Sequence, residues 1–421
     1  MSSTVVTPSP TTTQAAPPKT QRTNQANLYR PVGPKLIQAG LNAAPGQQIN
    51  LSQVVDLSLP IRGIRLVYKG RVVVGTTGVT TPSAEGFLNL LSNIVIQGTN
   101  ARQKGNVTLW SIDLATLYGI MHLISSDNAA YYSINNQDGK GEVQITAPGT
   151  PYTFASTDQN TYNPTGTTGT YDYRVVIDLP FYPFASQAFG EHPNWVPAFL
   201  VRNEEWKDSL QLNFQFPLVT NGAVAGPLGT GASGTTFVFT AYGSGAGNPT
   251  LDCYSLPIIM GNDLKDEVLP GILVRTATPI NTILQSAGNA VTLLNMQKQP
   301  TTRVYVKNGV GTAPPAFSTL LDTNITAIGI QLGANRNVRN VVDTFAHKAL
   351  TYDDYQRRQI QGYMEFDFMD SGNPDSAYPG QNIGDGSTFQ LVANVAGVAN
   401  AQGIIIQEQA LHTPTGALYT F

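Results

Sequence analysis

A short pattern that occurs twice constrains the fold of this chain more than any other feature of its sequence. Residues 94–102 read IVIQGTNAR and residues 328–336 read IGIQLGANR, so two Ile residues, a Gln and an Arg keep the same spacing. One such match carries little weight in a chain rich in Gly, Asn and Thr. The segments around it therefore decide between coincidence and internal duplication.

Three further pairs of segments recur in the same order around this pattern. They are RLVYKG (65–70) with RVYVKNG (303–309), YRVVID (173–178) with YMEFDF (363–368), and LQLNFQF (210–216) with FQLVANV (389–395). The spacing differs between the halves because the first carries an extra segment rich in Gly, Thr, Asn and Pro, residues 134–170. The shared order predicts an internal duplication. The matching residues of the opening pattern are then structural counterparts rather than ligands: Gln97 and Arg102 in the first half, Gln331 and Arg336 in the second.

Each half reads as a series of short strands. Residues 210–216 alternate apolar and polar side chains, as a half-buried strand does, and similar runs are separated by turn residues. One helix is predicted in each half, at 109–124 and at 350–363, the second with Thr351 and Asp354 as a capping pair. About eight strands in two sheets form a jelly roll. We therefore predict an all-β chain of two tandem eight-stranded jelly rolls, each a β-sandwich with a short flanking helix, plus an N-terminal arm.

The predicted organisation has three parts: an arm at 1–45, a first jelly roll at 46–262 with a long loop at 134–170, and a second jelly roll at 263–421. The arm is basic, and no acid precedes Asp56, although the net charge of the chain is −3. Such a segment is expected to be a disordered tail, above all over residues 1–20, or an arm that orders against a neighbouring subunit or an anionic surface, and both can hold because such arms often order only on assembly. The residues predicted to face a membrane or a neighbour are Lys19, Arg22, Arg30 and Lys35.

Composition excludes several classes of protein. Charged residues make up 12% of the chain, about half of the share typical of globular domains, and low charge suits a surface covered by copies of the same chain. The negative net charge argues against sequence-specific nucleic-acid binding. Cys253 is the only cysteine, which excludes an intrachain disulfide and a cysteine-based zinc site. No apolar run is long enough to cross a bilayer, and the first residues do not resemble a secretory signal.

Residues that could carry catalysis are scattered. The four histidines lack metal-ligand spacing and do not follow the duplication, and the Gly-rich segments 229–235 and 243–248 lack the features of a phosphate-binding loop. Glu204 and Glu205 beside Trp206 could contact a carbohydrate, but a surface turn or helix start is the better interpretation. A calcium site is a minor alternative for Asp370, Asp375 and Asp385. We expect no catalytic residues, no cofactor and no metal, and hence no enzyme.

The chain resembles the double jelly-roll major capsid proteins of tailless icosahedral viruses that contain an internal membrane, a group that includes bacteriophages. The segments that carry this resemblance are INLSQVVDLSLPIRGIRLVYKG after the basic arm, YRVVIDLPFYPFASQAF followed by LVRNEEWKDSLQLNFQF, and LTYDDYQRRQIQG followed by YMEFDF. It covers most of residues 45–421 by layout and short patterns rather than by a signature motif.

The resemblance implies a structural capsid subunit of the virion shell, made in the host cytoplasm. In that family three subunits form a pseudo-hexagonal block of six jelly rolls, which tiles an icosahedral shell. The implied partners are a homotrimer, neighbouring capsomers, minor capsid proteins and the internal lipid membrane. The arm would face inward, and long loops would form outer towers, with residues 134–170, 217–235 and 370–386 as candidates.

Two other classes stay open from the residues alone. The first is a carbohydrate-binding or adhesin-type β-sandwich protein that binds a receptor, which the lack of a recognisable secretory signal disfavours. The second is a duplicated-sandwich enzyme such as a glycosidase or bicupin, which the poor pairing of histidines and acids disfavours.

Overall fold

The computed structural model describes most of the chain after the first 28 residues. The described residues are 29–51, 55–75, 79–83, 85–124, 130–134, 137–139, 169–183, 199–206, 210–222, 225–231, 233–260, 268–296, 301–311, 317, 319–332, 336–355, 360–368, 389–412 and 415–416.

The first half forms a sandwich that we call roll 1. One of its sheets, the β4 sheet, has the strand order β2 (Lys35–Asn42), β15 (Thr250–Met260), β4 (Ile61–Gly75) and β10 (Gly169–Pro180). The other, the β6 sheet, has the order β3 (Gln48–Leu51), β11 (Gln211–Gln215), β6 (Asn93–Asn100) and β7 (Gly105–Ile112). These neighbours pair antiparallel.

The second half forms roll 2 in the same way. Its β19 sheet has the order β17 (Ile272–Pro279), β25 (Ala401–His412), β19 (Thr301–Val310) and β23 (Tyr363–Asp367). Its β21 sheet has the order β18 (Gly288–Met296), β24 (Phe389–Val395), β21 (Ile325–Leu332) and β22 (Arg336–Asp343). The eight strands of each roll can be numbered one to eight in chain order. In both rolls one sheet then has the order 1, 8, 3, 6, and the other sheet has the order 2, 7, 4, 5.

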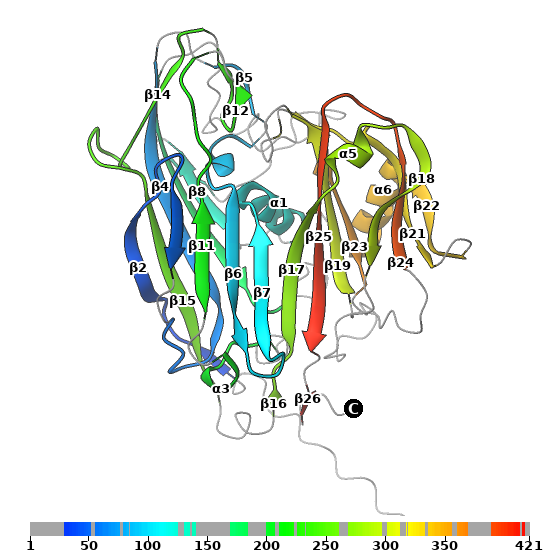
Figure 1. The fold of residues 1–421 in the computed structure, drawn as a ribbon, viewed down its shortest axis with the longest axis horizontal. Helices are drawn as coiled ribbons and strands as arrows, with labels where there is room; N and C mark the ends of the chain where they lie inside the picture. Colours follow the sequence, from blue (N-terminus) through cyan, green and yellow to red (C-terminus); the bar gives the residue numbers. More distant parts are fainter. Residues whose placement is uncertain are drawn as a thin grey trace, which may run out of the picture.

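This identity of strand order confirms the predicted pair of jelly rolls. The four recurring sequence pairs lie on corresponding strands: β4 with β19, β6 with β21, β10 with β23, and β11 with β24. Figure 1 shows the two rolls side by side, with the strands of both lying roughly along the vertical of the view.

Shorter elements extend these sheets or lie at their ends. β1 (Tyr29–Pro31) pairs with β15 beside β2, so the last part of the predicted arm is built into the β4 sheet. The remaining short strands are β5 (Val79–Pro82), β8 (Ala130–Ile134), β9 (Gln137–Gly139), β12 (Ala225–Gly226), β13 (Gly229–Gly231), β14 (Thr236–Thr240), β16 (Val268–Leu269), β20 (Thr319–Leu320) and β26 (Thr415–Gly416). The short helical segments are η2 (Gly86–Leu90), α3 (Asn203–Trp206) and α5 (Asn281–Leu284).

Two longer helices occupy corresponding places in the rolls. α1 (Leu114–Ile124) follows β7, and α6 (Thr344–Tyr355) follows β22, so each connects the fifth strand to the sixth. An aspartate caps each helix: Asp113 Oδ1 accepts from the Thr116 amide at 2.7 Å, and Asp343 Oδ1 accepts from the amides of Phe345 and Ala346 at 2.9 and 3.3 Å. The same capping chemistry thus starts both helices.

The predicted start of the helix was wrong in both halves, whereas the predicted end of the first helix, at residue 124, is confirmed. The first helix begins at Leu114 because residues 105–112 form a strand. The second begins at Thr344 rather than at 350, because Asp343 supplies the cap, and it ends at Tyr355. Thr351 therefore lies inside the helix, where its hydroxyl donates to the His347 carbonyl at 2.8 Å instead of capping.

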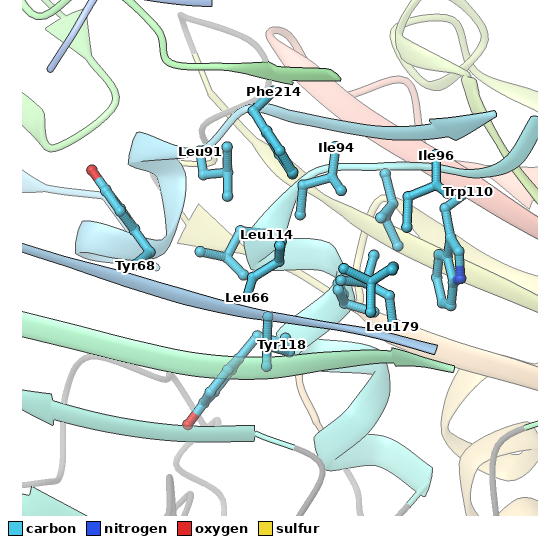
Figure 2. Close-up of a cluster of buried hydrophobic side chains, with 14 of the residues drawn as sticks. Leu66, Tyr68, Leu91, Ile94, Ile96, Trp110, Leu114, Tyr118, Leu179 and Phe214 are labelled. Atoms are coloured by element: carbon cyan, nitrogen blue, oxygen red, sulfur yellow. The ribbon is translucent and has the colours of Figure 1, made fainter. Parts of the chain in front are cut away.

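Two apolar cores fill the rolls. Figure 2 shows part of the first, where Leu66 and Leu179 of the β4 sheet meet Ile94 and Phe214 of the β6 sheet, with Leu114 of α1 beside them. The second core lies between the β19 and β21 sheets and includes, among others, Val304, Val306, Ile328, Ile330, Phe366, Leu391 and Ile405. Every residue of β23 is buried, and so is nearly every residue of β19, because these strands have a covered outer face as well.

Removing the cap of α6 tests the helix boundary. Asp343→Ala should destabilise the protein by about 1 kcal/mol, because two amide donors lose their acceptor. Asp343→Asn is the matched control and should stay close to wild type, since an Asn oxygen caps equally well. Urea unfolding followed by circular dichroism measures both, and equal stability of the two variants would contradict this start of the helix.

Candidate functional site at the junction of the two rolls

The two rolls are joined through a continuous sheet. β7 of roll 1 lies beside β17 of roll 2 in parallel, with Trp110 opposite Arg275, and this contact merges the β6 and β19 sheets into one 9-stranded sheet. Figure 1 shows β6, β7, β17, β25 and β19 in one row across the middle of the molecule. The parallel pairing of β7 with β17 is short, so contacts between side chains must supply most of the stability of the junction.

Arg275 is the central side chain of this junction. Its Nε donates to Glu408 Oε2 at 2.6 Å, while Nη1 and Nη2 donate to the carbonyls of Pro180 and Tyr182 in roll 1 at 2.9 and 2.7 Å. The guanidinium also lies 4.2 Å from the centre of the Trp110 ring. Burial lowers the pKa of Arg275, and the Glu408 carboxylate opposes that shift. A fully buried cation is tolerated here because every side of it has a partner.

A second set of buried polar side chains forms hydrogen bonds between the two rolls beside α1. Lys307 on β19 donates to Glu85 Oε2 at 2.6 Å and to Thr116 Oγ1 at 3.3 Å, both in roll 1. The Tyr363 hydroxyl on β23 donates to the other Glu85 oxygen at 2.8 Å. Burial raises the pKa of Glu85, while Lys307 and Tyr363 oppose the shift. Burial, together with the nearby carboxylate of Glu85, also raises the pKa of Tyr363 well above its ordinary value.

α1 contacts roll 2 along one face. The Ala115 carbonyl accepts a long hydrogen bond from Tyr363 at 3.4 Å, Thr116 contacts Lys307, and Gly119 leaves space for the Tyr363 ring. A Cβ at position 119 would come within 2.3 Å of that ring. Ala115, Thr116 and Gly119 form a narrow helix surface, and the small residue at 119 lets the ring approach closely.

An ion pair on β19 has a counterpart on β4. Arg303 lies opposite Asp367 of β23, with Nε to Oδ2 at 3.1 Å and exposed fractions of 1% and 4%. Arg65 lies opposite Asp178 of β10, with Nε to Oδ1 at 2.6 Å, but these side chains are 35% and 25% exposed. The same pair is therefore buried in roll 2 and open to solvent in roll 1.

The predicted arm residues lie in two settings. Lys19 and Arg22 fall outside the described residues. Arg30 is exposed on β1, and Lys35 begins β2, where its ammonium pairs with Asp56 and lowers the pKa of that carboxyl. Their role toward a membrane or a neighbour stays a prediction.

The four residues of the repeated pattern lie in or beside corresponding strands. Gln97 of β6 faces Gln211 of β11 and bonds to it at 3.3 Å, and Gln331 of β21 faces Gln390 of β24. Arg102 donates to Glu205 at 2.7 Å and to the Pro270 carbonyl of roll 2. Arg336 begins β22. The structure brings Arg102 to the junction and leaves the other three in the sheets.

Other sequence candidates do not form a reaction centre in the described part of the chain. His347 is buried against Phe366, and its Nε2 lies 2.9 Å from the Glu365 carbonyl. Trp206 is a core residue of α3, which leaves no exposed ring for a sugar. Among the described residues, His, Cys, Asp and Glu side chains nowhere gather in threes as metal ligands would. Of the described helices, none is long and apolar enough to span a membrane. The three aspartates considered for calcium lie outside the described residues.

Sequence reasoning missed the junction itself. Arg275, Glu85 and Lys307 are far apart in the chain, and nothing in their local patterns shows that they become buried. One signal was available: an Arg followed four positions later by a Lys, in RLVYK (65–69) and again in RVYVK (303–307). Charged residues at the same positions of two corresponding strands indicate that this face of each strand points away from the core of its roll. They do not indicate in which of the two rolls the face is covered.

Removing one partner of the buried pair tests the strength of the junction. Lys307→Met should cost about 3–5 kcal/mol at pH 7, because Glu85 then stays buried without a counter-ion. The double variant with Glu85→Leu should recover most of this loss, since it removes both charges. Urea unfolding of the single and double variants measures the coupling between them, and a double variant no more stable than Lys307→Met would contradict it.

The same variant should respond to pH. With its folded-state pKa raised, Glu85 binds a proton more readily in the folded than in the unfolded protein, so its contribution to stability falls as pH rises through that pKa. The loss caused by Lys307→Met should therefore shrink as pH falls from 7 toward 5. Thermal unfolding across this range measures the trend, and a loss that grows in acid would contradict it.

A third variant tests the close packing of α1. Gly119→Ala raises helix propensity by about 1 kcal/mol, but its Cβ would clash with the buried ring of Tyr363, which costs about 1–3 kcal/mol. We expect a net loss of stability. Gly245→Ala is the control, since nothing lies near its added Cβ. A stabilised Gly119→Ala variant would contradict this packing.

Comparison with known proteins identifies the fold. No family model and no curated protein matches the sequence. The solved major capsid protein of Sulfolobus turreted icosahedral virus (STIV) is similar to this chain, with 14% identity, a TM-score of 0.52, and coverage of 93% of this chain and 97% of that one. VP54 of the virus PBCV-1 has 10% identity, a TM-score of 0.51, and coverage of 93% and 96%.

A chain from the atomic structure of the whole STIV particle gives a third similarity, with 14% identity, a TM-score of 0.50, and coverage of 93% and 91%. At this identity the comparisons establish architecture. They extend over both rolls and over almost the full length of each solved chain. The chain therefore has the double jelly-roll fold of these viral capsid proteins.

Proposed function

We propose that this protein is the structural major capsid protein of a tailless icosahedral virus that contains an internal membrane. The observation that carries the proposal is the pair of jelly rolls with one strand order, joined edge to edge by a buried junction. Two similar rolls fixed side by side give the chain two related halves that can take part in equivalent contacts. The STIV protein, which has this fold and matches this chain over 93% of its length, is a major capsid protein.

In this proposal the chain works by assembly and has no enzymatic step. Three copies form a pseudo-hexagonal block of six rolls, and these blocks tile the virion shell together with minor capsid proteins. Low charge supports this role, because few ions must be desolvated when large surfaces are covered. Of the domain boundaries proposed from the sequence, the one near 262 divides the two rolls, whereas the one near 45 falls after β1 and β2, which belong to the β4 sheet of roll 1.

We further propose that the basic residues before the first sheet act at the inner surface of the shell. Each basic residue near an anionic headgroup contributes about 1 kcal/mol of attraction, which is weak for one copy and strong for many. β1 and β2 are integrated into the β4 sheet, so we assign this role to the segment that precedes β1.

Mass and particle formation test the assembly role. Light scattering coupled to gel filtration should give the mass of a trimer, and electron microscopy of concentrated protein should show hexagonal blocks or shells. A stable monomer that binds glycans instead would favour the adhesin-type alternative and contradict the proposal.

A truncation tests the arm. Removing residues 2–28 should leave the trimer and its unfolding midpoint unchanged, because β1 and β2 are retained, but should lower the yield of shells and the binding to vesicles with anionic lipid. Vesicles of neutral lipid are the control. Unchanged shell yield and unchanged vesicle binding would contradict a role of this segment in assembly.

A further inference from the structure

The outward face of α6 is apolar although it lies open to solvent. Phe345 is 82% exposed and Leu350 is 53% exposed, and Ala346 and Ala349 on the same side of the helix are exposed as well. The inward face is polar, because His347, Lys348 and Thr351 are buried. A helix at a permanently wet surface has the opposite arrangement, so this face is built to be covered.

The internal duplication shows which surface of roll 1 corresponds to this face. Asp113 and Asp343 cap their helices in the same way, and the preceding strands share one register, with Ile94 opposite Ile112 and Ile328 opposite Val342. Counting onward from the two caps pairs Ala115 with Phe345, Thr116 with Ala346, and Gly119 with Ala349.

These three α1 positions contact roll 2. Within one chain, Ala115, Thr116 and Gly119 meet Lys307 and Tyr363 on the outer face of the β19 sheet. The corresponding α6 positions face solvent. The helix surface that roll 2 covers in roll 1 is therefore left uncovered in roll 2 itself.

The complementary sheet surface is left uncovered in roll 1. The counterpart of the β19 sheet is the β4 sheet, where Arg65 and Lys69 occupy the places of Arg303 and Lys307. Arg65 pairs with Asp178, and Lys69 Nζ lies 3.0 Å from Asp252 Oδ2, so the charges of this face are compensated within the sheet. Both basic side chains are about one-third exposed, whereas those of roll 2 are buried.

One chain cannot bring these two surfaces together. Figure 1 shows β4 and β2 at one side of the molecule and α6 at the other, with the junction between them. A second copy can supply the missing half. A contact of this head-to-tail kind uses two different surfaces on each copy, and it closes into a ring when the rotation between copies completes a turn.

We propose that the outward face of α6 packs on the outer face of the β4 sheet of a second copy, and so repeats between chains the contact that joins the two rolls within a chain. Phe345 would lie over the aliphatic stems and cationic heads of the paired Arg and Lys side chains. The occupant is this same chain. The inference rests on the proposed assembly role and adds the surfaces through which the copies meet.

A cross-link between chains tests the proposal. By analogy with Thr116 and Lys307, residue 346 of one copy should lie near residue 69 of the next, at a distance that a long Lys side chain spans and a disulfide does not. The variant with Ala346→Cys and Lys69→Cys, treated with a short bismaleimide, should give covalent dimers and trimers. The control carries Ala346→Cys and Leu218→Cys, with Leu218 exposed elsewhere on roll 1, and should stay uncross-linked.

Each outcome separates this contact from the proposed function. Cross-linked oligomers that show neither hexagonal blocks nor shells by electron microscopy would leave the contact standing and contradict the capsid role. A trimer that forms but does not cross-link would overturn the contact and leave the capsid role. A monomer at all concentrations would overturn both.

A charge placed on the helix gives an independent measurement. Phe345→Asp should weaken trimer formation at least tenfold by light scattering, while circular dichroism and the unfolding midpoint of the monomer stay unchanged, because the side chain is mostly exposed in one chain. Leu218→Asp is the matched control and should assemble as wild type does. Equal assembly of the two variants would overturn the proposal.

Discussion

The arrangement of the two rolls depends on the burial of Arg275. Its guanidinium belongs to roll 2, yet two of its hydrogen bonds end on carbonyls of roll 1 and its flat face lies on Trp110. A buried cation is costly unless all its donors are used, so small displacements of one roll against the other leave donors without partners. A second set of buried polar contacts joins the rolls where Lys307 and Tyr363 of roll 2 donate to Glu85 of roll 1. Two polar contacts therefore help to fix the orientation of the rolls, together with apolar side chains of roll 2, such as Ile272, Tyr305 and Ile406, that belong to the first core.

Duplication has produced two copies of one architecture with different surroundings. The pair of Arg303 and Asp367 is enclosed, while the matching pair of Arg65 and Asp178 is half open. The corresponding helices differ in the same sense, since the face of α1 toward roll 2 is covered and that of α6 is exposed. One contact is made within the chain, and its counterpart is available for a contact between chains. This asymmetry supports the proposed contact between copies, because a head-to-tail contact needs two different surfaces on each copy.

Much of the fold could be predicted from the sequence. Alternation of apolar residues in 210–216, and its recurrence in 389–395, indicated strands whose places in the two rolls proved to correspond. Helix boundaries could not be predicted as well, because Thr351 and Asp354 had the spacing of a cap while Asp343, at the end of a strand, made the cap in fact. Local sequence patterns predict whether a segment is a helix or a strand more reliably than they predict the residues at which it begins and ends.

The sequence by itself determined that the chain contains two copies of one eight-strand unit. The alternation of apolar and polar side chains marks the strands, and similar segments recur in the same order in both halves. Only the tertiary structure decided which surfaces are covered. Arg65 and Arg303 lie in similar local sequences, RLVYK and RVYVK, and so no local rule separates them. Their burial depends on whether another roll lies against them, which is a property of packing between segments far apart in the chain.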